Sequence, residues 1–182
     1  MKIISTEIED LFIIQPDIFS DDRGYFFESF NKKKFNENFS QIKFCQDNES
    51  KSSFGVLRGL HYQLSPKAQT KLVRVLKGKV LDVVVDIRQN SPSFGNHFSV
   101  ELSDENKKQL LIPRGFAHGF VVLSDEAVFS YKVDNYYDSK LERGIIFNDS
   151  FLQIDWRLNN EDLKLSNKDL KLTSFLEAQK FE

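Results

Sequence analysis

The stretch Val80-Leu-Asp-Val-Val-Val-Asp-Ile-Arg88 decides the fold that this sequence predicts. Alternate residues of a β-strand point to opposite faces of its sheet, and this stretch has that period. One face is apolar and carries Leu81, Val83, Val85 and Ile87. The other face carries two acids, Asp82 and Asp86. The stretch is therefore predicted to be a strand, which Gly78 precedes and a turn at 90–92 follows.

Shorter segments with strand character lie on both sides of it. We predict strands at 3–8, 11–15, 25–30, 71–77, 98–102, 109–112, 120–123, 127–133 and 145–147. Two pairs of these segments flank short polar loops, residues 103–108 and 124–126, and are predicted to form hairpins. Polar residues 20–24 and 47–53 are predicted to be loops. About ten short strands with little helix between them favour a mainly β antiparallel sandwich or barrel over βαβ units.

Two short helical segments are predicted outside the sheets. Asn31 is expected to cap a helix over 32–39 that places Phe35 and Phe39 on one face. Residues 166–169 are expected to begin a second helix. Because there is no internal repeat, linker or low-complexity tract, a single domain over 1–182 is the simplest organisation.

The composition excludes several classes of function. The formal net charge is −2, so the chain has no general attraction for nucleic acid or for membrane surfaces. No apolar run approaches the roughly 18 residues of a membrane-spanning helix, and the N-terminus, with its early acids, is unlike a signal peptide. The single cysteine, Cys45, allows no internal disulfide and no multi-cysteine metal site. We therefore expect a cytoplasmic protein whose anion sites depend on a few local cations.

The stretch Gly55-Val-Leu-Arg-Gly-Leu-His-Tyr-Gln63 is the first candidate for a functional site. It sets Arg58 and His61 three residues apart, with small or apolar residues between them. A permanent cation and a base that titrates near neutral pH, so close together in so apolar a setting, are expected to face one ligand.

A second candidate is His118, in the segment Pro113-Arg-Gly-Phe-Ala-His-Gly-Phe120. The spacing Pro-x-Gly-x-x-His resembles the second motif of the cupins, double-sheet jelly rolls in which a tight turn aims a histidine into the barrel mouth. A structural histidine at a turn is the alternative. The third histidine, His97, follows a turn and is expected at the surface.

The first cupin motif indicates whether a metal is held. A cupin metal site normally needs a His-x-His pair and a glutamate there, whereas this chain reads His61-Tyr62-Gln63. Two histidines without a clustered carboxylate hold a transition metal poorly. We therefore expect no metal and no other cofactor, which leaves His61 free to act as a base.

Cations and a tyrosine complete the set of candidates. Glycine-rich phosphate-binding loops are absent, so a phosphate has to be held by side-chain cations. Arg23, Arg58 and Lys71 are candidates because each lies among small or apolar residues, and an ordinary surface cation is the alternative for each. Tyr131 begins the segment 131–137, which holds three of the five tyrosines. A buried tyrosine that closes the barrel is the alternative to a catalytic role for Tyr131.

Together these residues resemble the dTDP-4-dehydrorhamnose 3,5-epimerase family over nearly the whole chain. The motifs that carry the resemblance are Asp22-Arg-Gly-Tyr-Phe-Phe-Glu28, Gln46-Asp-Asn48, Val56-Leu-Arg-Gly-Leu-His-Tyr-Gln63, Lys71-Leu-Val-Arg74, Asp82-Val-Val-Val-Asp86, Pro113–Phe120, Tyr131, Tyr136-Tyr137, Glu142, Asn148-Asp149 and Leu165-Ser-Asn-Lys-Asp169. The resemblance implies a cupin-type jelly-roll β-barrel or sandwich with a few short peripheral helices, working as a homodimer without metal. It also implies a dTDP-linked 4-keto-6-deoxy sugar as the substrate. On this basis dTDP-4-dehydro-6-deoxy-D-glucose is converted into dTDP-4-dehydro-L-rhamnose, in dTDP-L-rhamnose biosynthesis.

The resemblance also implies roles for individual residues. His61 is like the family's base, and Asp169 is like the carboxylate that orients it. Tyr131 is like the proton donor on the opposite face of the sugar, and Lys71 is like the cation near the C4 oxygen. The residues that match the family's other substrate contacts are Arg23, Glu28, Gln46, Asp47, Asn48, Arg58, His118, Tyr137, Glu142 and Lys168. Because Asp82 can also face the barrel interior, both Asp82 and Asp169 remain candidate partners of His61.

Three other functions remain open at this point. A 3- or 5-mono-epimerase, or an enzyme that acts on another nucleotide sugar, shares most of this pattern. A metal-dependent cupin such as a dioxygenase is disfavoured by the missing ligands. A non-catalytic sugar-binding jelly roll needs neither an acid nor a base, so the presence of both argues against it.

Overall fold

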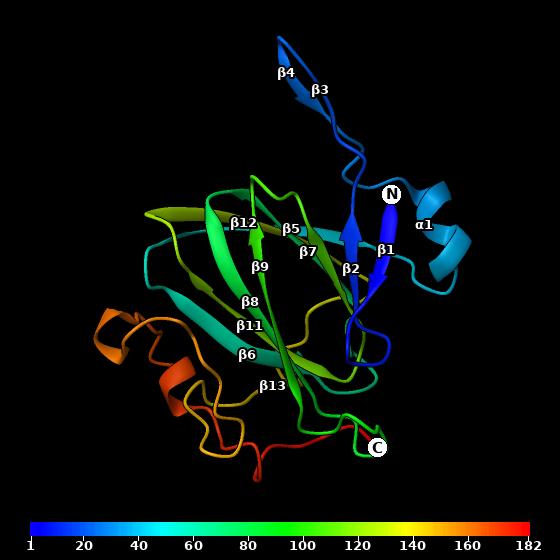
Figure 1. Ribbon diagram of the computed structural model, residues 1–182. Helices are drawn as coiled ribbons and strands as arrows, with labels where there is room; N and C mark the ends of the chain where they lie inside the picture. Colours follow the sequence, from blue (N-terminus) through cyan, green and yellow to red (C-terminus); the bar gives the residue numbers. More distant parts are fainter.

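The stretch around Val80 forms strand β8, Lys79–Asp86, and this strand is buried on both faces. A computed structural model describes all of residues 1–182 (Figure 1). On one face of β8, Leu81 and Val85 pack in an apolar cluster outside the sheet. On the other face, Val80 and Val84 join a cluster that lies between two sheets. The strand is therefore shared by two cores.

Two antiparallel sheets pack face to face and make up the body of the molecule (Figure 1). The six-stranded sheet has the order β1 (Lys2–Ser5), β2 (Phe12–Gln15), β10 (Gln109–Ile112), β7 (Lys71–Lys77), β12 (Glu126–Val133) and β5 (Gln46–Ser53). The five-stranded sheet has the order β13 (Glu142–Gly144), β6 (Leu57–Gln63), β11 (Phe116–Val122), β8 and β9 (His97–Ser103). The predicted mainly β sandwich of the cupin type is confirmed.

Both predicted hairpins are wrong, because the chain crosses between the sheets at these points. Strand β9 pairs with β8, whereas β10 pairs with β7 and β2, so residues 103–108 connect the two sheets. Strands β11 and β12 lie in different sheets in the same way, with residues 124–126 close to the crossing. A short polar loop is compatible with a corner between sheets as well as with a hairpin.

Strand β5 corrects the prediction of a loop at 47–53. It pairs antiparallel with β12 along its whole length, from Gln46 opposite Val133 to Ser53 opposite Glu126, at the edge of the six-stranded sheet. Its sequence, QDNESKSS, is polar throughout and therefore shows no apolar alternation. Backbone pairing with β12 defines this strand, while its side chains carry no period that marks it.

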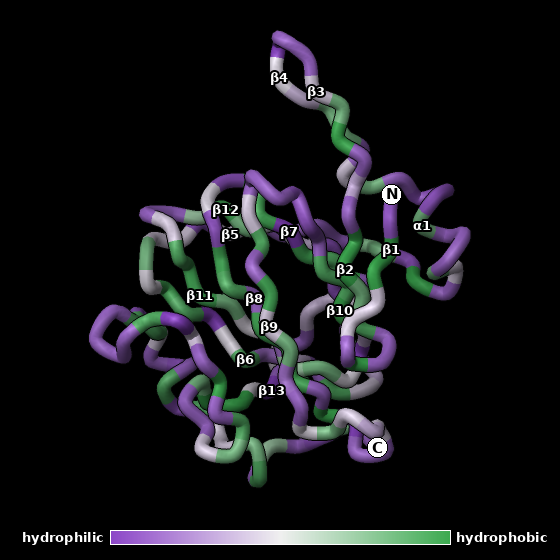
Figure 2. Tube along the Cα trace, viewed as in Figure 1, coloured by the Kyte–Doolittle hydropathy of each residue, from purple (hydrophilic) through white to green (hydrophobic).

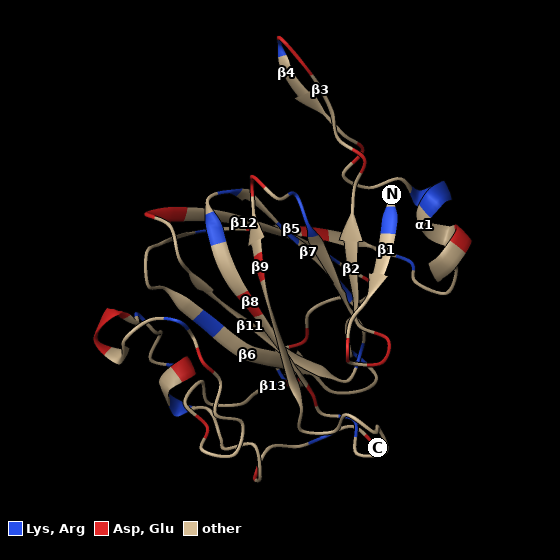
Figure 3. Ribbon diagram, viewed as in Figure 1, with Lys and Arg blue, Asp and Glu red and all other residues tan.

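A two-stranded arm, residues 19–26, extends away from the body at the top of Figure 1. It consists of β3 (Phe19–Asp21) and β4 (Gly24–Phe26). The loop predicted at 20–24 is therefore the end of a hairpin, and the strand predicted at 25–30 ends at Phe26. Phe19 and Phe26 are 63% and 67% exposed. The arm thus presents aromatic side chains to the surroundings, and its tip carries both signs of charge (Figure 3).

Helix α1, Lys32–Phe39, forms as predicted. The side-chain oxygen of Asn31 accepts hydrogen bonds from the backbone N–H groups of Lys33 and Lys34, which caps the helix. Phe35 and Phe39 are buried against the outer face of the six-stranded sheet. The chain has no helix that is long and apolar enough to span a membrane.

The C-terminal segment covers the outer face of the five-stranded sheet with little regular structure (yellow to red in Figure 1). It contains two 3-10 turns, η1 (Asn160–Asp162) and η2 (Asp169–Lys171). The helix predicted to begin at 166–169 is only the turn η2. Trp156 and Phe175, which are 5% and 1% exposed, anchor the segment in the outer apolar cluster.

The strand predicted at 145–147 is also displaced. Strand β13 covers Glu142–Gly144 instead, and Ile145 forms only an isolated bridge with Thr173. Along the trace, apolar residues are concentrated in the two sheets, and most loops and the tip of the arm are polar (Figure 2). The predicted core is therefore in place although several strand ends differ.

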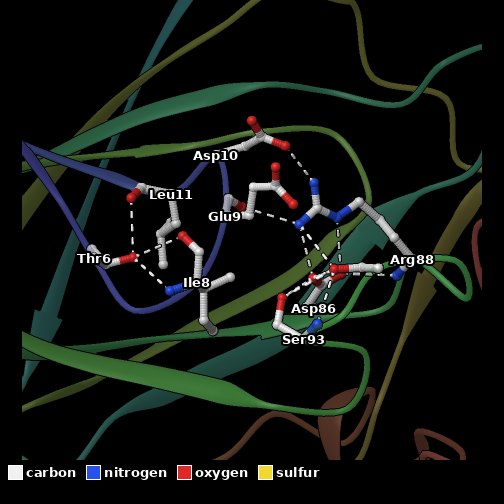
Figure 4. Close-up of polar contacts among 9 residues, drawn as sticks. Thr6, Ile8, Glu9, Asp10, Leu11, Asp86, Arg88 and Ser93 are labelled. Carbon is white, nitrogen blue, oxygen red and sulfur yellow. Dashed lines mark hydrogen bonds and ion pairs between the residues drawn. The ribbon is translucent and has the colours of Figure 1, made fainter.

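Arg88 pairs with the buried Asp86 at the end of β8 and also contacts the turn between β1 and β2 (Figure 4). Asp86 is 0% exposed, and its carboxylate accepts hydrogen bonds from the Arg88 guanidinium and from the hydroxyls of Ser91 and Ser93. Arg88 also donates to Asp10 in the turn, at 2.8 Å. One arginine thus joins two elements that are distant in sequence.

Candidate active site

A cavity of about 570 Å³ opens between the two sheets, which is within the size range of small-molecule sites. Side chains from both sheets line it. The predicted site residues among them are Arg58, His61, Lys71, His118, Tyr131, Lys168 and Asp169. The structure therefore brings together residues that are up to 111 positions apart, from Arg58 to Asp169.

Two glycines set how strands β6 and β11 approach each other at this cavity. Gly59 has a φ of +130°, and a Cβ there would lie 2.5 Å from the Cα of Gly119. A side chain at either position would therefore force the strands apart. With both glycines in place, the register puts His61 directly opposite His118.

His61 forms a close pair with a carboxylate from the C-terminal segment. Its Nε2 lies 2.6 Å from Oδ1 of Asp169, and Asp169 is 4% exposed. Burial would raise the pKa of Asp169, but the hydrogen bond from His61 and contacts with Ser166 hold it below the usual value. An ionised carboxylate at Nε2 fixes the tautomer with its proton on that nitrogen. The other ring nitrogen, Nδ1, is then the one that can accept a proton.

His118 forms a second histidine–carboxylate pair, deeper between the sheets. Its Nε2 lies 2.9 and 3.0 Å from the two carboxylate oxygens of Asp82, which is 0% exposed. Burial lowers the pKa of His118, with the attraction of Asp82 opposing it and Lys71 adding to it. Of the two candidate partners of His61, the geometry places Asp169 against His61 and Asp82 against His118.

The six-stranded sheet contributes a lysine and a tyrosine that face these histidines. Lys71 begins β7, and Tyr131 lies on the neighbouring strand β12. Burial lowers the pKa of Lys71 to about 8, against the attraction of Asp82 and Glu142. Burial raises the pKa of Tyr131, which keeps its phenol protonated at neutral pH. The cavity therefore offers a cation and a neutral acid on the side facing His61.

Arg58 brings a permanent positive charge to the same cavity. Its Nε donates to the hydroxyl of Ser52 at 3.1 Å, and no ion pair within the protein involves Arg58 or Lys71. Two cations without carboxylate partners beside an open cavity are suited to an anionic ligand.

A hydrogen-bonded group of three predicted residues lies near the cavity. The Tyr137 hydroxyl donates to Oε2 of Glu142 at 2.6 Å, and the Lys168 ammonium contacts the same oxygen. Burial would raise the pKa of Glu142, but Lys168 and Tyr137 hold it below the usual value. Tyr137 is 59% exposed, so its ring is available to a ligand.

Seven predicted substrate contacts do not line the cavity of their own chain. Two of them, Tyr137 and Glu142, belong to the group just described, and the other five lie on or near the arm or on β5. Arg23 lies on the arm, where it pairs with Asp21, and its side chain is 90% exposed. Glu28 pairs with Lys34 beyond the base of the arm. The other three occupy the edge strand β5 and are Gln46, Asp47 and Asn48. Within one chain, these five residues therefore do not complete the site.

The cavity also has lining residues that the sequence did not predict. They are chiefly Glu49 and Ser50 on β5, and Lys164 and Ser166 in the C-terminal segment. The sequence does not predict Glu49 and Ser50, because a uniformly polar strand has the local pattern of a loop. A backbone-pairing signal was needed to find them, and a single sequence contains none.

The third histidine lies apart from the cavity. His97 is half-buried at the start of β9, and its Nδ1 is buried without a hydrogen-bond partner, so the expected surface position is only partly right. No group of three or more His, Cys, Asp or Glu side chains in the structure is arranged to hold a metal ion. The expectation of a metal-free site remains a prediction.

Comparison with known proteins identifies the family. The family model described as dTDP-4-dehydrorhamnose 3,5-epimerase matches residues 5–177. A dTDP-4-dehydrorhamnose 3,5-epimerase from Shigella flexneri is 56% identical over 161 residues, which are 88% of this chain and 89% of the relative.

Solved structures agree with this assignment. A dTDP-6-deoxy-D-glucose-3,5-epimerase from Legionella pneumophila, in complex with dTDP-4-keto-L-rhamnose, is 50% identical with a TM-score of 0.92, covering 97% of this chain and 93% of that one. A 3'-monoepimerase from Streptomyces bikiniensis, in complex with dTDP-quinovose, is 31% identical with a TM-score of 0.86, covering 94% and 86%. The chain therefore belongs to the dTDP-4-dehydrorhamnose 3,5-epimerase family of isomerases.

Proposed function

We propose that the protein converts dTDP-4-dehydro-6-deoxy-D-glucose into dTDP-4-dehydro-L-rhamnose, by inverting C3 and C5 beside the C4 ketone. One observation carries the proposal: His61 with Asp169 on one side of the cavity, and Tyr131 with Lys71 on the facing sheet. The Legionella relative, described in complex with dTDP-4-keto-L-rhamnose, supports the choice of sugar.

The first half of each inversion removes a proton next to the ketone. Such a proton is weakly acidic, so its removal needs both a base and a group that stabilises the enolate oxygen. His61 is the base, because Asp169 occupies Nε2 and leaves Nδ1 to take the proton. The Lys71 ammonium stabilises the negative charge that develops on the C4 oxygen.

The second half returns a proton to the opposite face of the same carbon. Tyr131 is the donor, because it faces the cavity from the other sheet and its raised pKa keeps the phenol protonated. Exchange with water then restores the proton of Tyr131 and removes the one held by His61. The sugar presents C3 and C5 in turn to this same pair.

The remaining residues bind the substrate. Arg58 contacts the diphosphate, since its charge has no partner within the protein. Tyr137 stacks on the thymine, and His118, Glu142 and Lys168 contact the substrate between these two ends. No cofactor takes part in this scheme.

We further propose a homodimer in which the arm of one protomer reaches the cavity of the other. Arg23 and Glu28 lie on or near the arm, away from their own cavity, and the exposed Phe19 and Phe26 need a surface to cover them. The dimer forms from single domains over 1–182 and acts in the cytoplasm, which suits its one free cysteine, Cys45.

Incubation of the keto sugar in deuterated water tests the reaction. A double epimerase places deuterium at both C3 and C5 and forms the L-rhamno product, whereas a mono-epimerase labels one of these carbons. His61→Asn is expected to abolish exchange at both carbons. Tyr131→Phe should still exchange a proton but slow the net inversion by roughly 10²- to 10⁴-fold.

The third histidine offers a matched control. His97→Asn changes a ring outside the cavity and should leave exchange and inversion unchanged. Exchange that persists in His61→Asn would remove His61 as the base. Label at a single carbon with the native enzyme would favour the alternative function, a 3- or 5-mono-epimerase like the Streptomyces relative.

A further inference from the structure

Asp169 belongs to no strand or α-helix, although its position against His61 is set to within hydrogen-bond distance. It begins η2, and the chain from 169 to 175, called the strap below, continues across the five-stranded sheet. At the start of η2, the Asp169 N–H donates to the hydroxyl of Ser166, three residues earlier, at 3.1 Å. A short 3-10 turn has too few hydrogen bonds to fix a side chain by itself. Other contacts must therefore hold the strap.

The strap runs beside residues 144–149 and contacts them at three successive points. Leu172 packs against Gly144, where a Cβ would lie 2.7 Å from both methyl carbons of Leu172. Thr173 accepts a backbone hydrogen bond from Ile146 at 2.9 Å, and its hydroxyl donates to the carbonyl of Gly144 at 3.3 Å. These two contacts fix the strap at the position where Gly144 pairs with His61 across β13 and β6.

The third contact comes from a buried carboxylate. Asp149 is 5% exposed, and its Oδ2 accepts the backbone N–H of Phe175 at 2.7 Å. Its Oδ1 accepts the N–H groups of Phe151 and Leu152, both at 3.0 Å. One carboxylate therefore joins the turn at 149–152 to the end of the strap, 26 residues later.

We propose that Asp149 is a positioning residue for catalysis, which acts through the strap to hold Asp169 against the His61 ring. The effect on catalysis rests on the proposed function, because that function makes His61 the base. The three contacts with residues 144–149 hold the strap in a fixed position relative to β13 and β6. With the last point released, Asp169 samples positions away from His61, and the ring loses the partner that fixes its tautomer.

Asp149→Asn is the direct test. An asparagine has only one carboxamide oxygen, so it can accept from Phe175 or from the turn at 151–152, and its NH₂ group faces a donor at the other. We expect kcat to fall about 10- to 100-fold with KM nearly unchanged, because misplacing a catalytic group by about 1 Å costs that much. The matched control is Ser174→Ala. Ser174 also lies on the strap, but its hydroxyl bonds to Glu177 and not to residues 144–149.

The ¹⁵N signals of the histidine rings report the tautomer of each ring. A general loss of stability does not change the tautomer of His61 alone. The chain has three histidines, so ¹⁵N signals of each ring can be assigned by substitution. In the native protein His61 should show a single tautomer, with the proton on Nε2. Asp149→Asn should give a mixture of both tautomers at His61. The His118 signals should stay unchanged, because their partner Asp82 lies on β8 and not on the strap.

These outcomes separate the inference from the proposed function. A His61 ring that keeps one tautomer in Asp149→Asn overturns the positioning role, whatever the activity. A mixture of tautomers with an unchanged kcat upholds the positioning by Asp149 and refutes His61 as the base. If the His118 signals show that Asp149→Asn does not fold, Thr173→Val tests the strap at another of its fixed points, because it removes only the hydroxyl contact with Gly144. A His61 ring that keeps one tautomer in Thr173→Val overturns the transmission through the strap, on which the role of Asp149 depends.

Discussion

At the scale of single residues, two histidine–carboxylate pairs share one cavity but differ in access. The side chain of His61 is 28% exposed and that of His118 is 8% exposed. A base must reach both the substrate and, later, water, which favours His61 for proton transfer. A histidine kept neutral by burial is better suited to hydrogen bonding with the sugar. The environment of each pair thus separates two roles that the same residue types can fill.

Lys71 makes the pH dependence of the reaction predictable. Its pKa is lowered to about 8, and only its ammonium form stabilises an enolate. We expect kcat/KM to fall about tenfold per pH unit above that pKa, as the ammonium loses its proton. The raised pKa of Tyr131 places the loss of its proton at higher pH, so Tyr131 does not set this limb. A pH–rate profile from 6 to about 10 is the measurement.

Lys71→Arg provides the comparison for this profile. An arginine stays charged over the whole range, so the alkaline limb should move to higher pH even if the maximum rate falls. A native profile that is flat up to about pH 10 would show either that the pKa of Lys71 is not lowered by burial or that its charge is not needed.

The surroundings of single residues in the sequence predict much of the site, but they leave the carboxylate partner of His61 open. Arg58, His61 and His118 stood out because cations and imidazoles are rare in apolar surroundings. The partner of His61 could not be chosen between Asp82 and Asp169. Asp169 lies on an irregular segment, and irregular backbone has no period from which the direction of a side chain follows.

At the scale of secondary-structure elements, strands were easier to predict than their pairing. The alternation in Val80–Arg88 locates β8 to within two residues at each end. Alternation predicts which way a side chain points, but not which sheet the strand joins. The sequence therefore predicts hairpins at both points where the chain crosses between the sheets. Strand β5 was missed because its residues are all polar. Pairing with β12 is a long-range property that the local sequence does not contain.

Through Arg88, the Asp86–Arg88 pair holds the turn between β1 and β2 to the end of β8. Loss of this pair should therefore lower the stability of the protein. Asp86→Asn should lower the free energy of unfolding by about 3 kcal/mol, because it leaves a charged guanidinium without its buried partner. Urea denaturation at pH 7 measures this. Glu105→Gln, at an exposed position without side-chain contacts, should change the stability by less than about 0.5 kcal/mol.

The same pair predicts the direction of a pH effect on stability. Burial would raise the pKa of Asp86, but hydrogen bonds from Arg88, Ser91 and Ser93 hold it below the usual value. A carboxyl group with a lowered pKa in the folded state stabilises the protein above its unfolded pKa of about 3.9, and this contribution is lost as the pH falls through the folded pKa. The stability difference between native protein and Asp86→Asn should therefore shrink below about pH 4. A difference that stays constant down to pH 2 would refute the ionised state of Asp86.

At the scale of the whole molecule, one protomer contains the chemistry but not the complete set of predicted contacts. The cavity holds the proposed acid, the proposed base and two cations, whereas Arg23 and Glu28 lie elsewhere. On the arm, the exposed Phe19 and Phe26 lie opposite each other in the pairing of β3 and β4. The sequence predicted these residues as contacts by resemblance alone, because local patterns do not show which copy of a chain a side chain serves.

Mixing two impaired variants tests whether Arg23 acts on the cavity of the other protomer. Arg23→Ala should raise KM by weakening diphosphate binding, and His61→Asn should abolish turnover. In a symmetric dimer, a mixed pair has one site with both His61 and an intact arm from its partner, and one site with neither. Unfolding and refolding an equal mixture should restore about a quarter of native activity at low substrate concentration, since half of the dimers then contain one complete site. Activity no higher than the average of the two separate variants would mean that Arg23 serves its own chain, and the arm would then have to fold back onto its own cavity.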